Sequence, residues 1–242
     1  MGLIETAVES RINHWLKEHE LFDGTTLKLI AAVAMIFDHI AMTLLVRSGQ
    51  VSWLADIDFV RLDFCYRVFR ALGRLSFPVF AFLLVEGMKH TSDERRYLTR
   101  LLVFALLSEL PFDLAVDGRL GLSHQNVFFT LALGAFMIAL MKRFGYEWQL
   151  VIVLCAAMAA YVCHFDYNAY GILLLAVFWW FSNNRIRSVS LGFLLFLEEP
   201  YSVLGFATLL FYNGKRGAGL RYFFYLFYPL HLLALYFLWH GI

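Results

Sequence analysis

The chain has 242 residues, of which 61% are hydrophobic and 16% are charged, and its formal net charge is +1. Soluble domains are about half apolar and about a quarter charged, so this composition excludes an ordinary soluble domain and indicates helices that face lipid. A net charge near zero gives no overall basic field, so we expect no nucleic-acid partner. The three cysteines form no CxxC pair, so we expect neither a disulfide framework nor a bound metal.

Residues 1–26 predict an amphipathic helix that lies at the membrane interface. Apolar residues, among them Ile4, Val8 and Trp15, fall near one face of this helix, and charged residues occupy the other face. The same periodicity fits a soluble helix that packs on a neighbouring segment. We expect the remaining residues, 27–242, to form one transmembrane bundle.

Nine apolar runs follow, and they predict helices over residues 27–46, 72–88, 97–116, 125–141, 148–163, 168–182, 187–198, 201–213 and 220–239. The longest connection, 47–71, is expected to be a loop. A helix needs about 20 residues to cross a bilayer, so the two shortest runs, the seventh and the eighth, predict either a re-entrant hairpin or tilted crossings. The predicted fold class is therefore an all-α integral membrane protein. It is a polytopic bundle of about nine transmembrane helices, within a range of about seven to ten.

The basic residues alternate between successive loops and so predict an orientation. Loops 89–100, 142–147, 183–187 and 214–221 carry two or more Lys or Arg residues, whereas loop 117–124 carries one and loop 164–167 carries none. Cytoplasmic loops are enriched in Lys and Arg, so the basic loops and the N-terminus are expected inside. The arginines of segment 47–71 break this pattern, although its aspartates partly balance them.

Asp38 and His39 stand in the middle of the first apolar run. Ionisable groups at membrane depth are costly and usually have a function, and adjacent helical residues point about 100° apart. His39 is the natural general base of the chain. The alternatives are a pair that joins two helices, and a proton relay in a transporter or flippase. Lys28 lies on the same face, about 16 Å away along the helix, where it could anchor a phosphate-bearing donor or simply extend to the interface.

Further polar residues are predicted at both ends of the bundle. Arg74 could pair with Asp38, bind an acceptor carboxylate or anchor the helix at the interface. Glu109 and Asp113 share a helix face and are expected, with His124, to line an outward-facing polar entrance that recognises an amine or hydroxyl acceptor. His231 lies deep among aromatic residues, either as a hydrogen-bonded core residue or as part of the acceptor-binding set.

Five motifs in this order resemble the TraX family: LKLIAAVAMIFDHIA, GRLSFPVFAFLLVEG, TSDERRYLTRLLVFALLSELPFDLA, QNVFFTLALG and FYPLHL. The resemblance covers about residues 27–235. This family is named for conjugal-transfer proteins that N-acetylate pilin, and it is related to the wider group of transmembrane acyltransferases. The resemblance implies a bacterial inner-membrane acetyltransferase with acetyl-CoA as donor. The acceptor is unknown and could be a pilin-like N-terminus, a glycan or a small molecule.

The resemblance also implies roles for individual residues. His39 matches the catalytic histidine, and Asp38 would orient it or pair with a nearby base. Arg74 and Asn126 are carried over as catalytic residues, either of which could stabilise the oxyanion of a direct transfer; an acetyl-histidine intermediate is the competing route. Basic residues suit the phosphates of CoA, and we expect these at Lys28, Arg96, Arg100, Lys215 and Arg216.

Overall fold

The computed structural model describes residues 11–12, 14–50, 54, 57–121, 123–197 and 199–240. Across these residues the chain is helical, with ten α-helices, α2 to α11, and no β-strand; Phe22 with Tyr212 and Gln125 with Phe165 form isolated bridges. Residues 1–10 of the predicted interfacial helix lie outside the described residues. Within the described part of that segment, residues 14–18 are helical.

Helix α2 (Gly24–Ile40) begins where the Asp23 side chain accepts a hydrogen bond from Thr26 N at 2.7 Å, as an N-cap should. Its far end continues as a π-helical turn over Ala41–Leu45. Single π turns inside helices are rare and often accompany functional sites. This turn begins two residues after His39, a feature that hydropathy cannot reveal.

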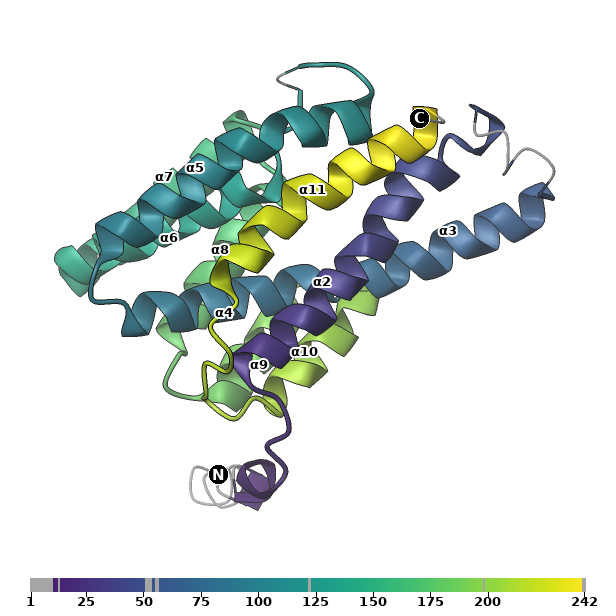
Figure 1. Ribbon diagram of the computed structural model, residues 1–242. Coiled ribbons are helices and arrows are strands. Elements are labelled where there is room, and N and C mark those ends of the chain that lie inside the picture. Colours follow the sequence, from purple (N-terminus) through teal and green to yellow (C-terminus); the bar gives the residue numbers. More distant parts are fainter. Residues whose placement is uncertain are drawn as a thin grey trace.

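The predicted loop over 47–71 is wrong in its second half, because α3 (Phe59–Gly73) forms there. Asp58 caps this helix, and an Asp63–Arg67 ion pair at 2.8 Å lies on its exposed face. These charges lower the mean hydropathy of the segment, so a search for long apolar runs does not detect this helix. Helix α4 (Ser76–His90) follows after a short break, and Figure 1 shows α3 and α4 as one long rod.

The other helices pack around this rod. Helices α5 (Glu94–Phe112), α6 (Val127–Arg143), α7 (Tyr146–Val162) and α8 (Asn168–Trp180) lie side by side, and α11 (Arg221–His240) returns along α2 and α5 (Figure 1). Helices α9 (Arg185–Leu195) and α10 (Val203–Leu210) have 11 and 8 residues and pack on each other. At about 1.5 Å per residue, neither can cross a layer about 30 Å thick on its own.

The outer surface of the bundle is apolar. Helices α5, α7 and α11 expose Leu102, Leu106, Leu110, Leu150, Leu154, Met158, Leu226 and Leu230. Exposed apolar surface of this extent is typical of contact with lipid. By length and composition, three segments can cross a membrane: Gly24–Leu45, Phe59–His90 and Tyr222–His240. The number of crossings and the position of the N-terminus stay predictions.

Candidate functional site

A cavity of about 680 Å³ joins the basic loops to the middle of the bundle. Its outer part is lined by exposed residues of the α4–α5 and α10–α11 loops, including Ser92 and Gly214. Its walls are the aromatic and aliphatic side chains of α4, α5, α6 and α11. Its inner part is lined by Asp38, His39 and Asp166. A volume of this size is typical of a site that encloses a small organic ligand.

His39 is 7% exposed and its ring is held by His231, 192 positions away in the sequence. The Nδ1 atom of His231 lies 2.8 Å from the carbonyl oxygen of Phe227. A carbonyl can only accept, so Nδ1 of His231 carries the proton, and in the neutral ring Nε2 must accept. The 2.6 Å contact between His231 Nε2 and His39 Nδ1 is then a hydrogen bond that His39 donates.

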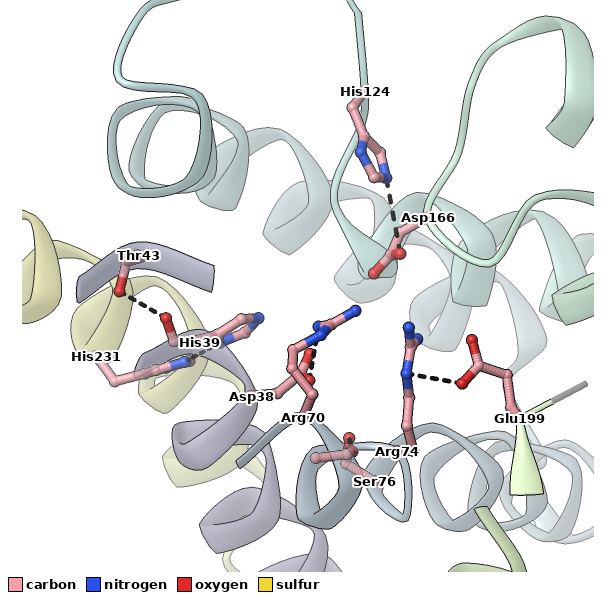
Figure 2. Close-up of polar contacts among 11 residues, drawn as sticks. Asp38, His39, Thr43, Arg70, Arg74, Ser76, His124, Asp166, Glu199 and His231 are labelled. Carbon is pink, nitrogen blue, oxygen red and sulfur yellow. Dashed lines mark hydrogen bonds and ion pairs between the residues drawn. The ribbon is translucent and has the colours of Figure 1, made fainter. Parts of the chain in front are cut away.

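This arrangement fixes the tautomer of His39. With its proton on Nδ1, His39 keeps a lone pair on Nε2, and Nε2 makes no hydrogen bond with any described residue. His39 lines the cavity, and in Figure 2 its ring lies alongside His231. A basic ring nitrogen without a partner, beside a cavity, has the geometry of a general base.

Asp38 also lines the cavity, but it pairs with Arg70 of α3 rather than with Arg74. The Arg70 Nη1 atom lies 2.7 Å from Asp38 Oδ1, whereas Arg74 Nε lies 3.0 Å from Glu199 Oε2 (Figure 2). Of the alternatives for Arg74, the pair with Asp38 is therefore not formed. The close approach of α2 and α3 explains the choice, because Asp38 packs against Gly73, where no Cβ fits.

Four of the five predicted donor-binding cations line the cavity: Lys28, Arg96, Arg100 and Arg216. The Arg100 Nε atom is buried and has no hydrogen-bond partner among the described residues, so its N–H is available to an acceptor in the cavity. Lys28 lies over the Phe224 ring at 5.7 Å, and Arg96 pairs with Asp93 at 3.0 Å. The fifth, Lys215, is exposed and lies outside the lining.

Asn126 is fully buried and acts as a helix cap. Its Oδ1 accepts from Phe128 N at 3.0 Å, and its Nδ2 donates to Ala105 O at 2.8 Å and to Glu109 Oε2 at 2.5 Å. The side chain does not line the cavity, and both amide protons are used. The structure therefore gives Asn126 no free donor for an oxyanion.

Three of the predicted acceptor residues, Glu109, Asp113 and His124, lie close to one another near Asn126. Asp113 accepts from Gly121 N at 2.9 Å, and Glu109 lies within electrostatic range of Asp113 and His124. The His124 Nε2 atom lies 3.7 Å from Asp166 Oδ1. None of the four predicted acceptor residues lines the cavity, and His231 lies behind His39. Asp166, the partner of His124, does line it. His231 thus orients His39, a role that sequence spacing did not predict.

Three residues of the site were not singled out from the sequence. Arg70 was seen only as a neighbour of Arg74 on the helix face. Tyr228 lines the cavity with its ring centroid 5.7 Å from that of His39, and its buried hydroxyl proton has no acceptor among the described residues. Tyr167 lines the inner end and stacks on Phe77 at 3.7 Å. No local sequence pattern distinguishes these tyrosines from the other aromatic residues.

Comparison with known proteins agrees with the motifs quoted above. Residues 23–239 match the sequence profile of the family described as TraX protein. The chain is similar to the probable fimbrial assembly protein FimC, serogroup H1, of Dichelobacter nodosus, with 32% identity over 248 residues that cover 88% of this chain and 94% of that protein. No solved structure matches the chain. A match over nearly the whole chain, together with this identity, shows that the chain belongs to the TraX protein family.

Proposed function

We propose that this chain is an inner-membrane acetyltransferase that moves an acetyl group from acetyl-CoA to an amine or hydroxyl acceptor of a pilus or fimbria system. One observation carries the proposal. A single cavity connects four cationic side chains at its outer part to the unpartnered Nε2 of His39 at its inner end. The name of the Dichelobacter relative, a fimbrial assembly protein, supports the biological setting.

The cavity suits a long ligand with one anionic end. Arg100, Arg216 and Lys28 can bind the phosphates of CoA, and the unpartnered Arg100 Nε can donate to one of them. The apolar walls, which include Phe80 and Leu84, suit the pantetheine arm. Lys28 and His39 are 11 residues apart on one helix, or about 16 Å along its axis. The phosphates and the thioester can therefore occupy the two ends at once.

In the proposed reaction, His39 Nε2 takes a proton from the acceptor as the acceptor nitrogen or oxygen attacks the thioester carbonyl. The carbon–sulfur bond then breaks, and the CoA thiolate takes the proton back from His39. His231 Nε2 accepts from His39 Nδ1 throughout and so stabilises the imidazolium. The free hydroxyl proton of Tyr228 is the donor that the geometry favours for the oxyanion, in place of Asn126 and Arg74.

The test uses purified protein in detergent. Wild-type protein, His39→Ala and His240→Ala are mixed with acetyl-CoA, with water as the acceptor that slowly hydrolyses the thioester. Calorimetry records binding, and a thiol reagent records CoA release. We expect all three to bind and only His39→Ala to lose thiol release. His240 is a matched control because it is exposed on α11, away from the cavity.

Two outcomes would change the proposal. If the wild-type protein binds neither acetyl-CoA nor a longer acyl-CoA, the enzyme proposal fails, and proton-coupled flux in liposomes would test the transporter alternative. If acetyl label stays on the wild-type protein without acceptor and is absent from His39→Ala, direct transfer is wrong and an acetyl-histidine intermediate replaces it.

A further inference from the structure

The turn between α7 and α8 holds three non-glycine residues in the left-handed region. His164, Tyr167 and Asn168 have φ angles of 52°, 61° and 50°. Non-glycine residues with positive φ are uncommon, and clusters of them occur at functional sites, where contacts with the surrounding structure hold the strained backbone in place. Here the support comes from Gln125, whose backbone N and O bond to His164 O at 3.1 Å and to Asp166 N at 2.9 Å.

This strained turn presents Asp166 to the inner end of the cavity. Its Oδ1 accepts from Tyr167 N at 3.0 Å and faces His124, whereas its Oδ2 has no hydrogen-bond partner among the described residues. Figure 2 shows this second oxygen pointing away from His124, on the side of the Arg70 guanidinium. Asp166 is thus a carboxylate with one fixed oxygen and one oxygen free to bind.

The two ends of the cavity therefore have opposite character. The outer part gathers cations for an anionic donor. At the inner end Asp38 is already paired with Arg70, so Asp166 is the carboxylate left to receive a second ligand. An ammonium group is the ligand that a free carboxylate oxygen favours over a neutral hydroxyl, since a charge-assisted hydrogen bond is about twice as strong as a neutral one.

We propose that Asp166 binds the ammonium group of the acceptor and that Asp166 and His124 carry the acceptor's surplus proton to solvent at the surface where His124 is exposed. This inference rests on the proposed acetyl transfer and adds the acceptor subsite to it. Neither residue is assigned to the donor.

The proton balance explains why an exit is needed. An ammonium acceptor held by Asp166 must first release one proton, which leaves past His124, and it then becomes a neutral amine. The amine nitrogen then bonds to the acetyl carbon and gives a second proton to His39; the carbon–sulfur bond breaks, and His39 returns that proton to the thiolate. The products are an amide, CoA thiol and one free proton, whereas a hydroxyl acceptor releases none.

His124 is placed to pass that proton on. Its side chain is 42% exposed, so it connects Asp166 to solvent. The Asp166 carboxylate, 3.7 Å from His124 Nε2, is the main cause of a raised pKa of His124, to which the charges of Asp117 and Glu109 also contribute. The titratable groups that face Asp166 are His124, Asp38, Tyr167 and Tyr228. Figure 2 also shows the guanidinium groups of Arg70 and Arg74 on the side of Asp166 opposite His124.

The experiment compares Asp166→Asn, His124→Gln and the control Asp63→Asn with wild-type protein. Asn keeps the oxygen that accepts from Tyr167 N, and Asp63 is a surface carboxylate paired with Arg67. Each protein receives acetyl-CoA with one of two probes: a short apolar peptide with a free α-amine, or its analogue with a hydroxyl in that position. Calorimetry gives acetyl-CoA binding, and CoA thiol release gives the rates across a range of pH.

We expect Asp166→Asn to bind acetyl-CoA within about twofold of wild type and to raise KM for the amine probe at least about tenfold, the loss of one charge-assisted bond. KM for the hydroxyl probe should stay unchanged. His124→Gln should lower kcat for the amine probe and shift its pH profile without changing KM. Asp63→Asn should match wild type.

Several results would overturn the inference while the acetyltransferase proposal stands. One is that Asp166→Asn keeps the wild-type KM and pH profile for the amine probe. A second is that Asp166→Asn raises KM equally for the amine and the hydroxyl probe. A third is that the amine probe does not accelerate thiol release by the wild-type protein. Loss of acetyl-CoA binding in Asp166→Asn would also overturn it, because the residue would then support the whole site. Failure of wild-type protein to bind acetyl-CoA would instead refute the proposed function, and with it the subsite.

Discussion

Replacing His231 tests the assignment of the His39 tautomer. His231→Phe keeps a flat ring but removes the acceptor, so the buried His39 Nδ1–H loses its 2.6 Å partner. An unsatisfied buried donor costs about 1–3 kcal/mol. Partners that orient a metal-ligating histidine through its second ring nitrogen contribute about 10–100-fold, and we expect a similar size for this histidine pair; one decade of rate corresponds to about 1.36 kcal/mol. We therefore expect kcat to fall about 10–100-fold, with binding of acetyl-CoA unchanged.

His231→Gln provides the rescue. The amide oxygen of Gln can occupy the place of Nε2 and accept from His39, so this variant should recover part of the lost rate. His240→Phe is the matched control, since His240 lies on the same helix and its Nδ1 also contacts a carbonyl four residues earlier, at 3.0 Å. The assay is CoA thiol release with calorimetric binding alongside. Wild-type kcat in His231→Phe, or no difference between the Phe and Gln variants, would refute the tautomer argument.

Three further predictions concern the donor end, the helix crossing and the outer surface. Arg216→Ala should weaken acetyl-CoA binding about tenfold or more, whereas Lys215→Ala should not, because only the former lines the cavity; calorimetry on both variants decides this. Gly73→Ala should destabilise the protein by about 1–3 kcal/mol, since its methyl would collide with the aspartate of α2, and Gly49→Ala, with open space around it, should not; thermal unfolding measures both. The pKa of His124 is raised in the folded protein, so the stability that its charge contributes is complete below the ordinary pKa of about 6.5 and is lost as the pH rises through the raised pKa. The difference in Tm between wild type and His124→Gln should therefore shrink at alkaline pH. A difference that grows with pH would contradict this sign.

Hydropathy and spacing were enough to predict much of this protein. Long apolar runs dictate helices because a chain in lipid must satisfy its backbone hydrogen bonds internally, and each of the nine predicted runs overlaps an observed helix. Asp38 and His39 stood out because charge inside an apolar run is costly, and both line the cavity. Lys28 could be placed on the face of His39 from helical periodicity alone.

The helix α3 could not be predicted in this way. Its charged residues alternate with apolar ones, so the average apolarity of the segment is low, and its stability depends on packing against α2. The same packing decided which arginine meets Asp38. Arg70 and Arg74 are one turn apart on the same face, and only the crossing of α2 and α3 at Gly73 selects Arg70.

The sequence by itself determined the helical class, the deep Asp38–His39 pair and the basic loops, because each depends on local composition or on spacing along a single helix. The tertiary structure alone decided the partners. His231 meets His39 across 192 residues, Asn126 is used up as a cap, and a strained turn delivers Asp166 to the inner end of the cavity. Each of these contacts joins separate helices or loops, and the way in which separate elements pack is not encoded in any local pattern of residues.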